Sequence, residues 1–483
     1  MADISFHHGT RVFESQETPV LIRTMQSAVI AHIGTAPDAD VNVFPLNKPV
    51  LIKGAAEYSK VAALGDAGTL KASLDGAFDQ IGTYNYIVRV EEGVDMAATL
   101  ANLVGDGTAL TGVHALKKCE GLYGRKLKPR LVVVPGFTAS LASDGISGIA
   151  VAQAGTGYGP NTVVTVAGDG IGAELIPLIT AGTITGIAIK KPGFAFTAAP
   201  TLTITDPDGT GAGAAATATI GTVGNPVIAE LVGVLENLRA VALVDGPDTT
   251  DAAAVLWREK INSDRIYPID VKHLVFDKVL EAYVAQPASS RFAGVQARVD
   301  RQNGFWWSLS NKPINGISGV SRSISYGEQS DYLNENNVNT TINLGDGFIT
   351  WGNWLATGID LNRFVSVRRT MDFINEALEA AYLEFVDKPF SVANLKFMIE
   401  SGNAFLAVLK AEGAILGGRV WLDPERNTNE EMAQGRVTLG VEFEPPAPME
   451  DIRLIAHRQI RYYADLRSRV LEEIREGALA FAA

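Results

Sequence analysis

Leu131-Val132-Val133-Val134-Pro135-Gly136 is the stretch of sequence that decides the fold. Four apolar residues in a row, closed by Pro-Gly, are typical of a strand that is buried on both faces of a sheet. Residues 228–238 then carry Ile and Leu at helical spacing, and Ala240-Val241-Ala242-Leu243-Val244 forms a second apolar run. Strand, helix and strand together predict a βαβ unit within a mixed α/β core.

Residues 140–224 interrupt this unit at its first turn. They are rich in Gly, Ala and Thr, nearly free of aromatic residues and poor in charge. They also contain a duplication, because Ile146-Ser147-Gly148-Ile149-Ala150-Val151 returns as Ile184-Thr185-Gly186-Ile187-Ala188-Ile189, and Tyr158 in the first copy matches Phe196 in the second. Each copy alternates short β-rich runs with glycine turns, which predicts a small all-β domain inserted into the core.

The final third of the chain returns to mixed structure. Apolar residues at positions 374, 378, 381 and 385 fall on one side of a helix, and three acidic residues fall on the other side, which indicates an amphipathic helix. These acidic residues are Asp372, Glu376 and Glu379. A second helix is expected at residues 392–411, and strands are expected at 436–444 and 451–457.

The two ends of the chain lack the apolar pattern of a core and are expected to be arms. The fold class we predict is a multi-domain α+β protein, with a mixed α/β core, an inserted all-β domain and extended terminal arms. The expected segments are an N-terminal arm (1–25), a β-rich N-terminal domain (26–120), the α/β core (121–139 and 225–362), the inserted domain (140–224), a C-terminal α+β domain (363–458) and a C-terminal arm (459–483).

Composition narrows the class of protein. The chain has 483 residues and is 47% hydrophobic, so it can bury a sizeable core. Its net charge of −13 opposes binding to nucleic acid or to an anionic membrane. The single cysteine, Cys119, cannot form an internal disulfide, which favours folding in a reducing cytoplasm. We expect neither a secretory signal nor a membrane-spanning segment.

Catalytic and ligand-binding motifs are not evident. Glycine triplets at positions 168, 170 and 172 and at 209, 211 and 213 lie in equivalent turns of the duplication, whereas a dinucleotide-binding fingerprint needs a strand before and a helix after it. Asp206-Pro207-Asp208-Gly209 predicts a turn rather than a calcium loop. Phe305-Trp306-Trp307 indicates core packing or a subunit contact, with stacking on a sugar or base as the weaker alternative. We predict no catalytic residue, no cofactor and no metal site.

Many short segments of the chain match one protein family in order and spacing. These segments include Ile30–Ala36, Phe44–Ile52, Lys128–Leu131, Ser308–Asn311, Asn315–Val320, Gly345–Phe348, Val386–Pro389 and Pro445–Glu450. Through them the chain resembles the tail sheath proteins of contractile-tailed phages, especially the short sheaths of temperate myophages and R-type pyocins. The inserted domain is a departure from the plain sheaths of this type.

This resemblance implies a structural protein and not an enzyme. The subunits would polymerise as stacked hexameric rings around a tail tube, and their contraction would drive the tube through a bacterial envelope. The implied partners are further copies of the chain, the tube protein, and the baseplate and tail terminator proteins. The implied location is the virion tail, assembled in the cytoplasm of the host bacterium.

The same resemblance implies that the terminal arms donate strands to a neighbouring subunit. Such joints form by β-augmentation, in which main-chain hydrogen bonds connect the chains. The contacts are heterologous and therefore suit an open helical assembly. The candidate residues are Val20, Ile22 and Thr24 in the N-terminal strand, Ile460, Tyr462 and Ala464 in the C-terminal strand, and Val437, Leu439 and Val441 in the receiving strand.

Two other classes of protein stay open. A β-rich surface adhesin, or another interaction protein, is supported by the inserted domain alone. An uncharacterised hydrolase is the weaker alternative, because any chain with 54 acidic residues contains candidate carboxylate pairs.

Overall fold

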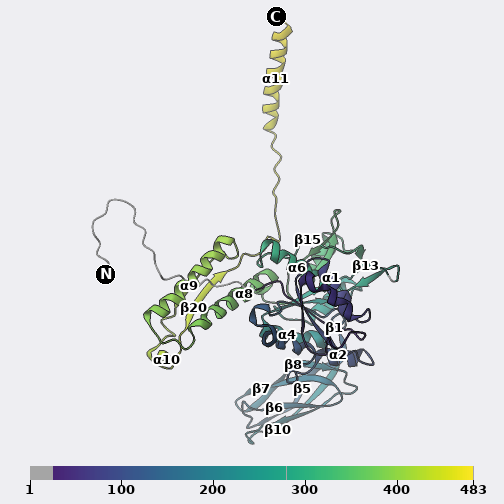
Figure 1. The fold of residues 1–483 in the computed structure, drawn as a ribbon, viewed down its shortest axis with the longest axis vertical. Helices are drawn as coiled ribbons and strands as arrows, with labels where there is room; N and C mark the ends of the chain where they lie inside the picture. Colours follow the sequence, from purple (N-terminus) through teal and green to yellow (C-terminus); the bar gives the residue numbers. More distant parts are fainter. Residues whose placement is uncertain (1–25, 279, 482–483) are drawn as a thin grey trace, which may run out of the picture. The chain divides into compact units, whose positions relative to one another are not determined.

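A computed structural model describes residues 26–278 and 280–481, and the chain divides into two units at residue 447. The first unit is built around a six-stranded sheet with the strand order β12-β11-β4-β1-β3-β2 (Figure 1). All of these strands run parallel except β2, which is antiparallel to β3. The strands are β1 (Ile30–Thr35), β2 (Val50–Lys53), β3 (Tyr84–Val90), β4 (Leu131–Val133), β11 (Val241–Asp245) and β12 (Ile266–Ile269).

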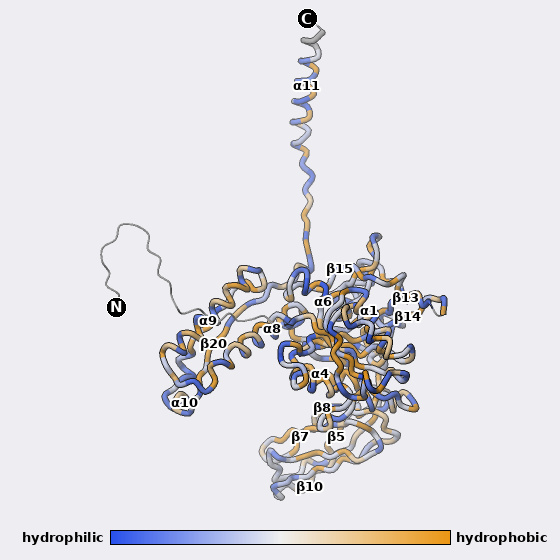
Figure 2. The backbone as a smooth tube through the Cα atoms, viewed as in Figure 1, coloured by the Kyte–Doolittle hydropathy of each residue, from blue (hydrophilic) through white to orange (hydrophobic). Residues whose placement is uncertain are grey.

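Helices cover both faces of this sheet, and the apolar runs fill both layers. Val132 of β4 packs into one layer, while Leu131 and Val133 pack into the other. Figure 2 shows this concentration of hydrophobic residues in the central strands. The mixed α+β fold class predicted from the sequence is therefore confirmed. The helices around the sheet are η1 (Gly54–Leu64), α1 (Leu70–Phe78), α2 (Met96–Val104), η2 (Gly112–Lys117), α3 (Lys118–Tyr123), η3 (Arg125–Leu127), α4 (Pro226–Leu238), α5 (Asp251–Glu259) and α6 (Ser289–Asn303).

The boundary that we predicted at residue 120 falls inside this sheet. β1 pairs in parallel with β3 on one side and with β4 on the other, so residues 26–120 and the α/β core share one set of strands. Hydrophobic patterns identify strands but do not specify which strands pair across long stretches of chain. The expected N-terminal domain is thus one half of the core.

The inserted domain contains a second six-stranded sheet with the order β5-β10-β9-β6-β7-β8. Its two terminal strands, β5 and β8, also pack against each other around a small apolar core. The aromatic residue of each copy lies on a glycine of the other: a Cβ atom added to Gly211 would meet the Tyr158 ring at 2.4 Å, and one added to Gly170 would meet Phe196 at 2.3 Å. The middle glycine of each triplet therefore serves close packing against an aromatic ring. The strands are β5 (Ala142–Thr156), β6 (Val163–Ala167), β7 (Ile171–Thr180), β8 (Thr183–Phe194), β9 (Thr201–Thr205) and β10 (Ala212–Val223).

The inserted domain enters and leaves the core at Asn225. The Asn225 amide nitrogen donates to the carbonyls of Phe137 and Ser140, both at 2.9 Å, and its side-chain oxygen caps the first turn of α4. Phe194, at the end of β8, is buried within the apolar layer of the core. The inserted domain is therefore anchored to the core by packing as well as by its two connections.

Two small sheets and one helix extend the core beyond α5. The strands β13 (His273–Asp277), β14 (Ala282–Gln286) and β16 (Gly319–Val320) form one sheet. The strands β15 (Lys312–Pro313), β18 (Phe348–Trp351) and β17 (Thr340–Asn343) form the other, beside α7 (Glu328–Glu335) and η4 (Asp360–Asn362).

The C-terminal α+β region has its own apolar core, formed by two long helices and a two-stranded sheet. Phe305 of the aromatic cluster stacks on Phe373 with ring centroids 3.7 Å apart, so core packing accounts for it. α9 is long and apolar enough to cross a membrane by composition, but Phe405, Leu406 and Leu409 are buried in this core. The elements are α8 (Val365–Tyr382), η5 (Leu383–Phe385), α9 (Val392–Glu412), β19 (Gly417–Leu422), α10 (Asn429–Ala433) and β20 (Leu439–Glu444).

In the second unit, residues 448–483, the side chains that the structure describes (448–477) form no buried core. Residues 448–459 have no regular secondary structure, and α11 (Tyr462–Phe481) follows. Large apolar side chains in this unit are exposed, including Ile452 (71%), Leu454 (89%) and Ile455 (82%). Apolar groups left in water are unfavourable, so this unit has surface that a partner would bury.

Candidate subunit-joining site

The sheet formed by β19 and β20 has the geometry of an incomplete sheet. The two strands are antiparallel, and neither pairs with a third strand in the part of the chain that the structure describes. One face of the pair packs through Val420, Leu439 and Phe443 on the core of the C-terminal region. A two-stranded sheet is stable in water only when it packs against other elements, as this one does, and added strands would stabilise it further.

Hydrogen bonds show which main-chain groups point away from the pair. Both main-chain groups of Val420 bond to Asn403 of α9, so they face away from β20. In an antiparallel pair, directly opposed residues have the same orientation and every second residue repeats it. The register places Val441 opposite Val420, so Leu439, Val441 and Phe443 direct their N–H and C=O groups to the outer edge of β20. Across the described ranges, no strand meets this edge.

Charge along this sheet is concentrated on exposed side chains. Glu442 of β20 forms an ion pair with Arg419 of β19 at 2.6 Å, and both side chains are more than half exposed. Glu444 is also exposed. The open edge of β20 therefore carries more acidic than basic groups, which favours a basic partner segment.

The predicted site residues fall in three different places. Leu439 and Val441 lie in β20, on its open edge, and Val437 precedes that strand. Val20, Ile22 and Thr24 lie outside the described residues. Ile460 precedes α11, and Tyr462 and Ala464 lie in its first turn.

The expected strand over residues 460–466 is thus wrong in its conformation. Residues 462–476 contain neither Gly nor Pro and are rich in Leu, Arg and Glu, which favour helices. Asp465 and Arg469 also have the i, i+4 spacing that supports a helix. The extended and exposed part of this unit is residues 448–459, which include the strand expected at 451–457.

Two of the three acidic residues of α8 that the amphipathic pattern placed away from the core, Asp372 and Glu376, are buried, whereas Glu379 is exposed. Asp372 accepts two hydrogen bonds from Arg265, at 2.7 and 3.0 Å, and one from Arg368 at 2.6 Å. Burial alone would raise the pKa of Asp372, but these two arginines hold it below its usual value. Glu376 pairs with Lys128 at 2.8 Å and with Arg130. The ion pairs of this joint between α8 and the core could not be predicted from the sequence, because Arg265, Lys128 and Arg130 come from segments distant from α8.

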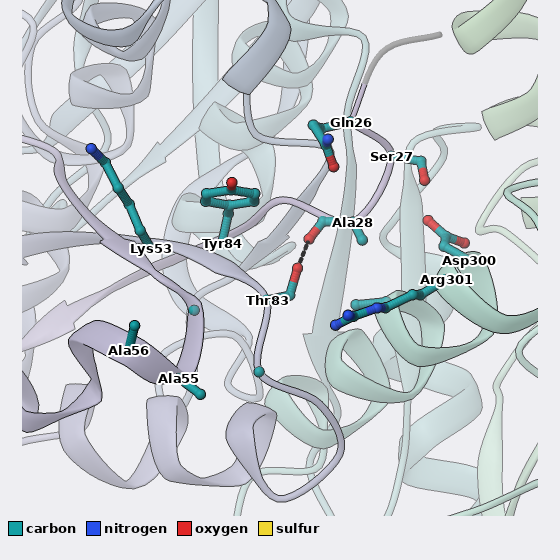
Figure 3. Close-up of a pocket in the computed structure, with 13 residues that line it drawn as sticks. Gln26, Ser27, Ala28, Lys53, Ala55, Ala56, Thr83, Tyr84, Asp300 and Arg301 are labelled. Carbon is teal, nitrogen blue, oxygen red and sulfur yellow. Dashed lines mark hydrogen bonds between the residues drawn. The ribbon is translucent and has the colours of Figure 1, made fainter.

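Arg369 of α8 connects this joint to the start of the described chain. Its guanidinium binds both carboxylate oxygens of Asp300, at 2.9 and 2.5 Å, and donates to the Ser27 carbonyl at 3.1 Å. A polar cavity of about 630 Å³ lies beside this point, with Gln26, Ser27 and Asp300 among its lining residues (Figure 3). The segment that leads to the N-terminal arm is therefore tied to a buried ion pair.

Groups that resemble catalytic ones are enclosed in the core. The His32 ring lies 2.6 Å from the Ser73 hydroxyl and 3.0 Å from the Asn85 side-chain oxygen, but the ring is fully buried, and burial lowers its pKa to about 4. Burial also raises the pKa of Asp245 to about 6, although Ser289 donates two hydrogen bonds to it. His32 and Asp245 are therefore buried and hydrogen-bonded within the core, as structural residues are.

The crevice in which doubly wound sheets bind ligands is occupied by a side chain. It lies at the carboxyl ends of the strands, here between β1 and β4, where the strand order reverses. A Cβ atom added to Gly34 or to Gly136 would meet the Thr69 side chain, at 2.3 and 3.3 Å. Among the described residues, no cluster of three or more potential metal ligands is present.

A closed α/β core, an ionic joint to a second domain and an unfinished sheet are features of a structural, self-assembling protein. The comparisons with known proteins agree. Residues 196–354 match the phage tail sheath protein central domain, and residues 361–456 match the phage tail sheath C-terminal domain. The chain belongs to the family of contractile phage tail sheath proteins.

The relatives are similar over nearly the whole chain. The tail sheath protein of Burkholderia phage BcepMu is 30% identical, and the match covers 98% of this chain and 99% of that protein. The tail sheath protein of Escherichia phage P2 is 26% identical over 95% of this chain and 98% of that protein. Both relatives are named as tail sheath proteins of phages.

Two solved structures share the fold. The contracted helical sheath of the anti-feeding prophage covers 94% of this chain and 100% of its own, with a TM-score of 0.58 and 16% identity. The contracted sheath of the extracellular contractile injection system PVC covers 95% of this chain and 99% of its own, with a TM-score of 0.58 and 15% identity.

Proposed function

We propose that this chain polymerises as stacked hexameric rings around a tail tube and contracts to drive the tube through a bacterial envelope. The observation that carries the proposal is the open edge of β20 in a chain whose C-terminal unit has no core of its own. Assembly would take place in the host cytoplasm, and the tube, baseplate and tail terminator proteins would be the other partners. The names of the relatives support a sheath, and the titles of two solved structures describe contracted sheaths.

The joint between subunits is a donated strand. The exposed segment 451–457 of one copy adds to β20 of a neighbour, where main-chain hydrogen bonds hold it and alternate side chains fix its register. Arg453, which pairs with Asp451 at 2.6 Å within the segment, is the cation that could meet the acidic Glu442 and Glu444 of the receiving strand. α11 follows the donated strand and brings its exposed apolar residues to the neighbour. Residues 20–24 remain the candidate for the N-terminal strand.

Contraction in this proposal is a rigid-body movement of whole subunits, with the arms as hinges. The buried ion pairs along α8 support it, because they connect the core and the C-terminal region into one body. The extended sheath would be a kinetically trapped state that releases free energy when it contracts.

Electron microscopy of the concentrated, purified protein tests the assembly directly. We expect tubes or cogwheel-shaped rings in negative stain, because each copy both offers a strand and accepts one. A protein that stays monomeric at high concentration and binds a cell surface, or hydrolyses a substrate, would contradict the proposal in favour of an adhesin or an enzyme.

The inserted domain is proposed to decorate the outside of the sheath. Excision of residues 141–224, with Ser140 joined to Asn225 by a short linker, should leave an assembling subunit, because the two ends already meet at a hydrogen bond. The excised subunit should lose about 3–5 kcal/mol of unfolding free energy, since the Phe194 ring leaves a void in the core. Urea denaturation measures this loss.

The matched control for the excision is Phe194→Ala in the full chain, which should cost a similar amount. An excised chain that cannot fold, beside a Phe194→Ala variant of normal stability, would contradict the view that the inserted domain is dispensable.

A further inference from the structure

The two edges of the β19–β20 sheet differ in the hydrogen bonds that they can offer. Asn403 of α9 accepts from the Val420 N–H at 2.8 Å and donates to the Val420 carbonyl at 2.9 Å. One amide side chain thus satisfies both outward groups of the residue near the middle of β19. A neighbouring strand would use the same two groups, so it could not pair there while Asn403 is in place.

The packing of α9 holds Asn403 in this position. Gly402, the preceding residue, lies so close to β19 that an added Cβ atom would sit 2.9 Å from the Val420 side chain and 2.4 Å from the Tyr382 hydroxyl. Leu406, one turn later, is buried in the same core as Val420. A helix and a polar side chain that cover a strand edge are a recognised way of preventing wrong pairing.

The opposite edge has the reverse character. Leu439, Val441 and Phe443 of β20 present three N–H and three C=O groups, and no strand in the described part of the chain pairs with them. A donated strand that bonds to this edge gains hydrogen bonds without displacing any.

We propose that Asn403 closes the β19 edge, so that a donated arm of a second copy joins the sheet only at β20. If two arms join one sheet, the second pairs with the first, which gives the order β19-β20-arm-arm. This inference rests on the proposed function, and it determines the side from which the neighbouring subunit approaches. Asn403 acts as a positioning residue that excludes the wrong edge.

Disulfide cross-linking in assembled sheaths tests the edge. Arg419 and Glu442 are directly opposite each other, so cysteines at the two positions report on β19 and β20 from matched places. Each of these two cysteines is combined with a second cysteine in the donated segment, placed at each of residues 451–457 in turn. Adjacent strands lie about 4.8 Å apart, within reach of a disulfide, whereas strands two apart lie at about 10 Å. Native Cys119 is buried, which raises its thiol pKa to about 12, so it should not interfere.

We expect covalent oligomers with Glu442→Cys and none with Arg419→Cys. In an Asn403→Ala background, the Arg419→Cys link should appear. Links through Arg419→Cys in the parent chain would overturn the edge assignment and leave the donated strand intact. If neither position forms a cross-link in assembled sheaths, the proposed donation of a strand between subunits would be contradicted. No Arg419→Cys link in the Asn403→Ala background would overturn the role of Asn403.

Hydrogen exchange on the unmodified protein provides a test that needs no variant. The Val420 amide should be protected in the free subunit, and the amides of Leu439, Val441 and Phe443 should become protected only on assembly. Protection that is already complete at β20 in the free subunit, with Val420 exchanging fast, would overturn the proposal.

Discussion

We expect removal of residues 448–483 to abolish sheath assembly and to leave a folded subunit. The apolar clusters of the first unit are built from residues no later than Phe443, so loss of the second unit should not change the free energy of unfolding by more than about 1 kcal/mol. It does contain the exposed segment 451–457 that we propose as the donated strand. Without it, the open edge of β20 loses the C-terminal one of its two candidate strands. Sedimentation should show a monomer at concentrations at which the full chain forms rings or tubes.

A shorter deletion is the matched control for this result. Removal of 477–483 leaves both the proposed strand and most of α11, and it should retain assembly. Normal sheaths from the chain that lacks 448–483 would show that this unit is not the joint. A truncated chain that unfolds would show instead that the unit supports its own subunit.

Replacement of Arg369 by Met should destabilise the subunit by about 3–5 kcal/mol. The guanidinium binds both oxygens of Asp300, and both residues are more than 90% buried. Loss of one partner leaves the carboxylate buried without its counter-charge, and this is the costly case for a buried ion pair. Urea denaturation followed by circular dichroism measures the change.

Arg436→Met is the control for charge loss at the surface. Arg436 pairs with Glu431 at 3.2 Å, but its side chain is 64% exposed, so its loss should cost less than about 1 kcal/mol. Equal effects of the two substitutions would mean that the joint along α8 contributes no more than a surface pair.

The local elements of this fold could be predicted from the sequence, but their arrangement could not. Leu131–Val134 and Ala240–Val244 are apolar runs whose burial does not depend on the details of their neighbours, and both are core strands. The central place of β1 depends on pairing between segments far apart in the chain, which no local pattern specifies. The duplication in the inserted domain was visible, because repeated turns and strands leave a repeated sequence.

The errors have physical causes. Asp372 and Glu376 were assigned to the polar side of a helix, yet Arg265 and Lys128, from distant segments, make their burial tolerable. The resemblance to sheath proteins implied a donated strand at residues 460–466, but their helix-forming side chains prevail in the single subunit. The strand that contains Leu439 and Val441 was predicted from its β-rich run, and their role as receiving residues stays a prediction. Asn403 was not predicted, because a single amide side chain in a helix gives no sequence signal of the groups with which it forms hydrogen bonds.

Because both ends of the inserted domain meet at Asn225, the core can accept an inserted domain at this position. A segment whose ends are held together adds little closure entropy to the core, and the cost grows only slowly with the length of the loop. Inserted domains of different size could therefore be exchanged there, while the core of the subunit stays unaltered. In the proposed sheath, the inserted domain and the core could therefore change at separate rates.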